Sequence, residues 1–90
     1  MKRWTQIFKA LANMNRLKII ALLADRMPLT VTEIADELGI SFRATSRHLL
    51  LLSSLDILVS QGKDGHVYYG YNSSMPVDIK KIVELFLHNL

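Results

Sequence analysis

Cysteine is absent from this sequence of 90 residues, and its absence removes several classes of function. No disulfide, thiolate metal site or cysteine nucleophile can form in the chain. No apolar run reaches the roughly 18 residues that a membrane-spanning helix requires, so we expect no membrane partner. The basic amino terminus is followed by polar residues rather than by the apolar stretch of a secretory signal. We therefore expect a cytoplasmic protein.

Recognisable catalytic motifs are also missing. The sequence has neither a glycine-rich phosphate loop before a helix nor a GxSxG motif, and no pair of acids marks an evident cleft. The histidines at 48, 66 and 88 are scattered, whereas a metal site needs several converging ligands. We accordingly expect no enzyme, no metal site and no cofactor.

The composition that remains is that of a small, slightly basic globular protein. Half of the residues are hydrophobic and the formal charge is +3, with an isoelectric point of about 9.5. This length predicts a single domain spanning residues 1–90. So small a domain is only marginally stabilised by its own core, which favours dimerisation. The charge fits a nucleic-acid partner, but many unrelated small proteins are equally basic.

The most informative segment lies in the middle of the sequence. Thr30 and Glu33 have the spacing of a capping box, which predicts the start of a helix. Gly39 suits the left-handed conformation that ends a helix, and Ser41 then caps a second helix running to about Ser54. Two helices joined in this way form a helix-turn-helix, whose second helix enters the DNA major groove.

The elements around this segment extend the prediction. Apolar residues at helical spacing predict two helices before residue 25 and a last helix from about Ile79. Leu29 is expected to add a short strand. Two β-prone stretches, 57–60 and 67–71, lie on either side of the Asp64-Gly65 turn signal and predict a hairpin. The order α-α-(β)-α-α-β-β-α is mainly helical with a small β-hairpin, which is a winged helix-turn-helix.

Candidate DNA contacts gather at the start of the second helix of this motif. Arg43 and Arg47 are four residues apart, so they project from one face and can reach phosphates or guanine edges. Ser46 lies beside them, and Ser41 with the first N–H groups of the helix can contact a phosphate. Phe42 can touch a thymine methyl or a sugar, or fold back onto the core. The alternative for all of them is an ordinary solvated helix face.

The tip of the hairpin carries two further candidates. Lys63 and His66 lie on either side of the predicted turn. A cation there is attracted by the negative potential of the DNA backbone or minor groove. The alternative is a solvated turn selected for its shape alone.

Two apolar stripes at opposite ends of the chain predict a dimer. Only part of each can face the core of one small domain, and the remainder suggests a helical interface that places two reading helices on two half-sites. The predicted interface residues are Trp4, Ile7, Phe8, Leu11, Ile79, Ile82, Val83, Phe86 and Leu87.

Four segments together resemble the ArsR-type family of winged-helix transcriptional repressors over almost the whole chain. Residues 8–20 resemble the opening pattern of the family, in which a leucine-alanine pair precedes a turn and an arginine, here Arg16. Residues 30–41 resemble the first helix and turn of the reading motif, and residues 64–69 resemble the wing. The most specific match is Ser-x-His-Leu, here residues 46–49.

The resemblance implies a dimeric repressor that binds double-stranded DNA. Its two subunits would be joined through their first and last helices, and an effector that the sequence does not identify would release the protein from DNA. It implies DNA contacts at Ser41, Arg43, Ser46, Arg47 and His48, with Lys63 in the wing.

The chain also departs from the family pattern. Ala35 and Asp36 stand in the region where the family often carries metal-binding cysteines, and Lys80 stands where a histidine would be wanted after an acid, so metal sensing is not expected. Asp56 replaces the glycine that commonly closes the reading helix, and aspartate tolerates the left-handed conformation. Leu50 stands at a usually polar position of the family, which leaves four consecutive leucines at 49–52, at least one of which should be exposed.

A second hypothesis comes from a different functional class. Leu50 and the modest net charge are compatible with a winged-helix module that binds another protein within a larger assembly. The two hypotheses differ in their response to salt, because DNA binding weakens steeply as the salt concentration rises and an apolar protein contact does not.

Overall fold

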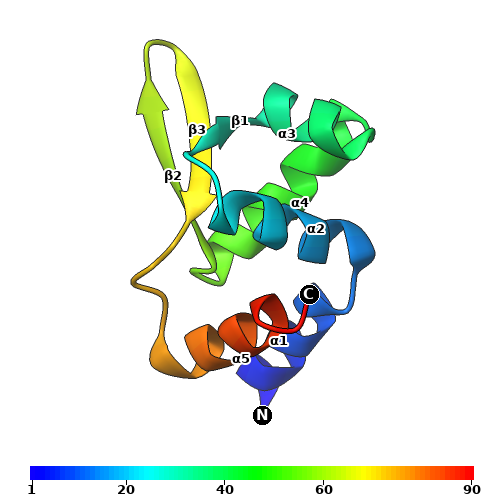
Figure 1. The fold of residues 1–90 in the computed structure, drawn as a ribbon, viewed down its shortest axis with the longest axis vertical. Helices are drawn as coiled ribbons and strands as arrows, with labels where there is room; N and C mark the ends of the chain where they lie inside the picture. Colours follow the sequence, from blue (N-terminus) through cyan, green and yellow to red (C-terminus); the bar gives the residue numbers. More distant parts are fainter.

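The computed structural model describes residues 1–90 and has the predicted order of elements. Five helices and three strands are arranged along a molecule whose longest dimension is 37 Å (Figure 1). The elements are α1 (Lys2–Leu11), α2 (Met14–Ala24), β1 (Leu29–Thr30), α3 (Val31–Leu38), α4 (Phe42–Ser54), β2 (Leu58–Lys63), β3 (His66–Tyr71) and α5 (Val77–Leu87). No helix combines the length and the hydrophobicity that crossing a bilayer would require.

Local signals in the sequence set the helix boundaries as predicted. The side chain of Thr30 accepts a hydrogen bond from the Glu33 N–H while the Glu33 carboxylate accepts one from the Thr30 N–H, which completes the capping box. Gly39 ends α3 in the left-handed conformation, with φ of 69°. Ser41 caps α4 by accepting from the Ala44 N–H at 3.0 Å. The capping box therefore fixes where α3 begins, and Gly39 and Ser41 form the turn between α3 and α4.

The wing is an antiparallel hairpin that is longer than predicted. The sheet has the strand order β1-β3-β2, and Lys63 pairs directly with His66 across the turn. Asp64 and Gly65 both have positive φ, 52° and 79°. Two such residues make the tight turn whose twist matches that of the strands, so pairing continues up to the turn itself.

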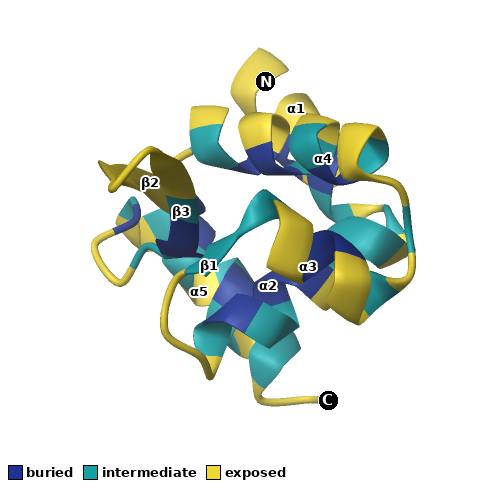
Figure 2. Cartoon of the chain, turned by 90° about the horizontal axis from the view of Figure 1, so that it is seen from above, coloured by how far each residue is buried: buried dark blue, intermediate teal, exposed yellow.

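The core lies where α1, α2, α4 and α5 meet the sheet. Thirteen buried residues form one cluster, to which Ile7 of α1, Leu49 of α4 and Val83 of α5 all belong. Figure 2 shows the buried parts turned inward and strand β2 of the wing largely exposed. Thr45 is the buried polar residue of α4, and its hydroxyl donates to the Ser41 carbonyl at 2.8 Å.

The turn after α4 confirms the prediction made for Asp56. This residue has a φ of 61°, which is the left-handed conformation that glycine more often supplies. The side-chain amide of Asn72 donates to the Asp56 carbonyl at 2.9 Å, so the turn is held by the segment that follows β3.

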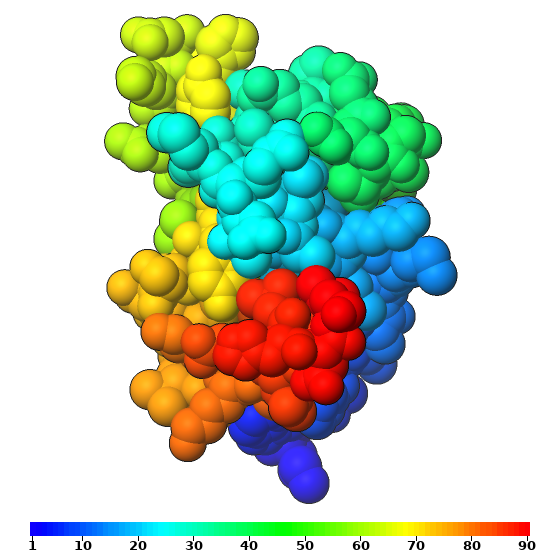
Figure 3. Space-filling view, in the orientation of Figure 1, coloured from blue at the N-terminus to red at the C-terminus, as the bar shows by residue number.

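The two ends of the long axis carry different elements. The wing, α3 and the start of α4 lie at one end, while α1, α5 and both chain termini lie at the other (Figure 1). The space-filling view shows the tip of the wing standing clear of the body at the upper end and α5 covering the lower part of the visible face (Figure 3).

Candidate DNA interface

The outward face of α4 carries most of the predicted DNA contacts. Arg43 and Arg47 are exposed, and Ser46 between them is half-buried. The inner face of the same helix is fixed by Thr45, Leu49 and Leu52, all of which are fully buried. Because packing of the inner face leaves no rotational freedom to the helix, the two guanidinium groups must project away from the core.

Helix α4 itself carries no acidic side chain beside these arginines. Glu33, Asp36 and Glu37 of α3 line a depression together with Arg26, to which α4 contributes no residue, and of the three only Glu33 also lines the cleft beside Phe42. One of these acids is neutralised locally, since Arg26 Nη2 lies 2.9 Å from Glu37 Oε1. The charge on the outward face of α4 is therefore purely positive, as binding to a polyanion requires.

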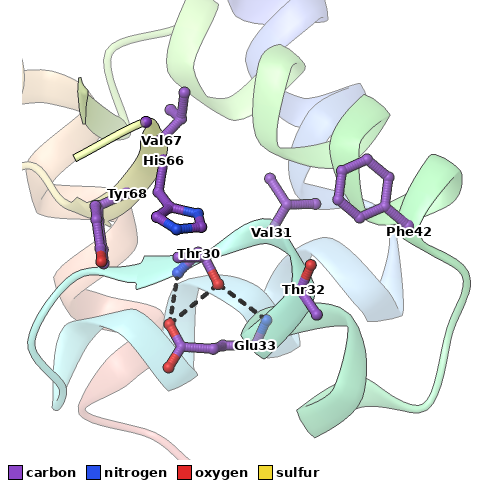
Figure 4. Close-up of a pocket in the computed structure, with 9 residues that line it drawn as sticks. Thr30, Val31, Thr32, Glu33, Phe42, His66, Val67 and Tyr68 are labelled. Carbon is purple, nitrogen blue, oxygen red and sulfur yellow. Dashed lines mark hydrogen bonds between the residues drawn. The ribbon is translucent and has the colours of Figure 1, made fainter. Parts of the chain in front are cut away.

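A cleft of about 500 Å³ separates the start of α4 from the wing. Phe42 lies on one side of it, and His66, Val67 and Tyr68 of the wing lie on the other (Figure 4). Phe42 is 58% exposed, so of its two predicted positions the structure adopts the outward one. The floor holds the Glu33 carboxylate, whose pKa is lowered chiefly by the hydrogen bond from the Thr30 backbone. This negative charge disfavours a phosphate at the floor of the cleft.

The wing presents its predicted candidates on one side. Directly paired residues of a hairpin share a face, so Lys63 and His66 lie together with Gln61 and Tyr68. Lys63 and His66 are exposed, and the rings of His66 and Tyr68 meet edge to face with centroids 6.4 Å apart. The wing can therefore offer a cation and polar groups to the DNA backbone.

His48 has a partner that the sequence did not reveal. Its Nδ1 lies 3.2 Å from Nη1 of Arg16 in α2, and the imidazole is half-buried. Burial lowers the pKa of His48, and the positive charge of Arg16 lowers it further. Arg16 and His48 are 32 residues apart, and no spacing rule connects positions so distant. In the sequence, each residue stood out only because it belongs to a segment that resembles the ArsR-type family, and the two segments are separate.

The structure removes three residues from the predicted dimer interface. Ile7, Ile79 and Val83 are buried within the single chain. The apolar spacing that selected them does not show whether the chain itself or a partner covers them. Phe8 is 56% exposed and stacks on Trp4, with ring centroids 5.8 Å apart. The remaining predicted residues, Trp4, Leu11, Ile82, Phe86 and Leu87, are half-buried.

Two further features of this end were missed by sequence reasoning. Leu85 of α5 is 66% exposed but falls outside the stripe that the helical spacing picked out. Arg3 and Asp78 form an ion pair between α1 and α5, with the shorter N–O distance at 2.7 Å. The hydrogen bond from Arg3 is the main cause that lowers the pKa of Asp78 to about 2.

Titratable side chains do not gather into a metal site. No group of three or more histidine, aspartate or glutamate side chains is arranged to hold a metal ion, and the chain has no cysteine.

A helix-turn-helix with an exposed basic face, followed by a β-hairpin, defines a winged helix-turn-helix DNA-binding protein. The model of the family described as bacterial regulatory protein, arsR family, matches residues 13–60. The chain belongs to this family.

Individual relatives agree with this assignment. The arsenical resistance operon repressor of Escherichia coli is 33% identical over 79 residues, which cover 88% of this chain and 68% of the relative. The structure of HlyU from Vibrio cholerae superposes with a TM-score of 0.77 at 30% identity, covering 98% of this chain and 90% of HlyU.

A third comparison comes from Mycobacterium bovis. The solution NMR structure of a homodimeric winged helix-turn-helix DNA-binding domain, from a possible ArsR-family transcriptional regulator, has a TM-score of 0.77 at 27% identity. The match covers 93% of this chain and 74% of that one. The family relatives are regulators rather than enzymes.

Proposed function

We propose that residues 1–90 act as one domain of a dimeric, sequence-specific transcriptional repressor, with no catalytic activity. The observation that carries this proposal is the exposed pair Arg43 and Arg47 on an acid-free helix whose inner face is fixed by the core. The proposal that the protein represses rather than activates transcription rests on the Escherichia coli relative, which is named as a repressor.

The residues at the start of the reading helix α4 have different roles in this proposal. Arg43 lies near the start of α4 and reads a guanine edge through two hydrogen bonds, while Arg47 is shared between a base and a phosphate. Ser41 and Ser46 contact phosphates, with the first N–H groups of α4 assisting. Phe42 supplies an apolar contact from the rim of the cleft.

In this proposal the wing and the reading helix α4 contact the duplex at two different places. Lys63 at the tip neutralises a phosphate, and His66 contacts the backbone beside it. These contacts set the register of the protein on the duplex without reading its sequence.

Dimerisation follows from the unpartnered apolar groups at the other end. Phe8 and Leu85 are exposed, and the half-buried rings of Trp4 and Phe86 lie on the same two helices, α1 and α5. The homodimeric Mycobacterium bovis domain supports association of such a fold. Two copies would place two α4 helices on half-sites about 34–36 Å apart.

The proposal is tested by selecting binding sites from a random duplex library and measuring affinity across salt concentrations. We expect an inverted-repeat site and an affinity that falls steeply with salt. A reporter placed behind the selected site should be silenced by the wild-type protein and not by the variant lacking both arginines. A protein that selects no sequence would contradict the proposal.

The exposure of Leu50 favours one alternative, a winged-helix module that binds another protein. Leu50 is 60% exposed in the middle of α4, where a purely DNA-reading face would be polar. Such a module would hold its partner through an apolar contact that persists at high salt, and it would show no preference among duplex sequences.

A further inference from the structure

The side chain of Arg16 joins three helices at one point. From α2, its Nε donates to the Ala10 carbonyl at 2.6 Å and its Nη2 donates to the Lys9 carbonyl at 3.1 Å. Both carbonyls belong to the last turn of α1, where no helical partner remains for them. The third nitrogen, Nη1, reaches Nδ1 of His48 in α4. Arg16 therefore connects the end of α1 with the recognition helix.

This contact determines where the imidazole proton lies. A guanidinium group can only donate hydrogen bonds, so Nδ1 of His48 must accept. The ring is then neutral and carries its proton on Nε2. The lowered pKa of His48 agrees with this state, because burial and the Arg16 charge both disfavour a second proton.

The Nε2–H group is left without a partner in the chain. No hydrogen bond from it exists in the structure, and Ser53 Oγ is the one buried side-chain polar atom that lacks a partner. Nε2 is therefore open to solvent. His48 follows the exposed Arg47 on α4 and is itself half-buried, so its ring lies beside the face that Arg43 and Arg47 present rather than at the centre of that face. Phosphates line both sides of the groove that a recognition helix enters.

We propose that Arg16 is a positioning residue for DNA recognition, which holds His48 as the Nε2–H tautomer so that this nitrogen donates to a DNA phosphate. The inference rests on the proposed function and assigns a role within it. His48 is then a neutral donor, unlike Arg43 and Lys63, and Arg16 acts on DNA only through His48.

The first experiment observes the tautomer directly. Nitrogen–proton correlation spectra of the imidazole rings, with His48 assigned by its loss in His48→Gln, should show the proton on Nε2 and a pKa below that of ordinary histidine. In Arg16→Gln the pKa of His48 should rise and the proton should distribute over both nitrogens. A proton found on Nδ1 of the wild-type ring, or a His48 pKa identical in the two proteins, would overturn the proposal.

The second experiment measures affinity for the selected duplex. Glutamine places an amide donor near the position of Nε2, so His48→Gln should bind nearly as the wild type does. His48→Ala should bind about threefold to tenfold more weakly per half-site, as expected for one neutral hydrogen bond. Arg16→Gln should show a loss of similar size. Lys18→Gln is the matched control, because it removes the same charge from an exposed site on α2 and should leave affinity unchanged.

The dependence of affinity on salt separates the alternatives. A neutral donor releases no counterion, so none of these variants should change the slope. A slope lowered by about one per half-site in Arg16→Gln would show that Arg16 itself contacts a phosphate, and the inference would fail. So would wild-type affinity in His48→Ala. If the wild type binds no duplex at all, the proposed function fails instead. If Arg16→Gln does not fold, the tautomer of the wild-type ring and the DNA affinities of His48→Ala and His48→Gln still test the proposal.

Discussion

The end of the molecule that carries the wing and the end that carries α1 and α5 expose different chemistry. At the wing end, Arg43, Arg47 and Lys63 are exposed cations, and α4 carries no acid. At the other end, Phe8 and Leu85 are exposed apolar groups, and the nearby charges of Arg3 and Asp78 neutralise each other.

The difference indicates two kinds of partner. Unpaired cations on a rigid helix favour a polyanion, because each contact with phosphate releases counterions. Exposed aromatic and aliphatic groups favour contact with a second apolar surface, because removing apolar area from water stabilises the complex whatever the charge. The same core holds both ends, since Ile7, Leu49 and Val83 belong to one cluster. A change at one end can therefore be tested for its effect at the other.

The largest effect is expected from removing the cations of the reading helix. Arg43→Ala and Arg47→Ala should each weaken binding to the specific site by about 1–3 kcal/mol, measured by fluorescence anisotropy. Loss of a base contact should reduce sequence preference, whereas loss of a phosphate contact should weaken all sequences alike and lower the salt slope by about one. We expect the first behaviour for Arg43 and a mixture for Arg47.

The control for this comparison removes a cation from the opposite end. Lys80 donates to the Ser73 carbonyl on the segment before α5, and Lys80→Ala should leave DNA affinity nearly unchanged. A folded double variant of Arg43 and Arg47 that binds the operator as tightly as the wild type would show that α4 is not the reading helix.

A charge placed at the other end should separate the two subunits. Phe8→Glu would put an unpaired carboxylate into an apolar interface and should raise the dimer dissociation constant about thirtyfold or more, as loss of about 2 kcal/mol at an interface aromatic does. Sedimentation equilibrium measures this. Since Phe8 is largely exposed, the circular dichroism spectrum should be retained.

Met27→Glu is the matched control for the dimer. Met27 is also exposed and apolar, but it lies in the loop between α2 and β1. The added carboxylate there should leave the sedimentation behaviour as it was. Equal dissociation in both variants would mean that the effect of Phe8→Glu comes from net charge and not from the interface.

The sequence predicted best what neighbouring residues decide. The capping box at Thr30, the left-handed Gly39 and the Asp64-Gly65 turn each depend on residues within a few positions, so spacing rules are sufficient for them. For the same reason the outward projection of Arg43 and Arg47 could be predicted, because it follows from the helical period once the inner face is known.

Spacing rules could not predict contacts between side chains that lie far apart in the sequence. Arg16 meets His48 across 32 residues and Arg3 meets Asp78 across 75, and one sequence gives no sign of either pair. The apolar stripe on the last helix was predicted correctly, but its spacing could not show that Ile79 and Val83 would be covered by their own chain while Leu85 would stay exposed.

A smaller effect tests Leu50, an exposed apolar residue in the middle of the reading helix. Leu50 lies seven residues after Arg43 and three after Arg47, on the same side of α4, and we expect it to touch a thymine methyl. Replacing each thymine of the selected site in turn by uracil removes only that methyl group. One replacement should weaken wild-type binding by up to about fourfold, the equivalent of about 0.8 kcal/mol for one buried methyl.

Leu50→Ala is the variant that assigns this methyl effect. It should bind the thymine site more weakly and should no longer distinguish thymine from uracil at that position. If no uracil replacement affects the wild type differently from Leu50→Ala, Leu50 does not read DNA, and its exposure instead supports the protein-binding alternative.

The smallest effect is expected at the ion pair between α1 and α5. Both partners are nearly half-exposed, and exposed ion pairs add little to stability. Because the folded state holds the pKa of Asp78 at about 2, below that of an ordinary aspartate, the pair stabilises the protein above about pH 4 and loses this effect as the pH falls toward 2. The melting temperatures of the wild type and Asp78→Asn should therefore differ slightly at pH 7 and converge in acid. The difference should also shrink at high salt, while DNA affinity at neutral pH stays the same. A difference that persists at pH 2 would mean that the asparagine disturbs packing between α1 and α5 rather than removing a charge.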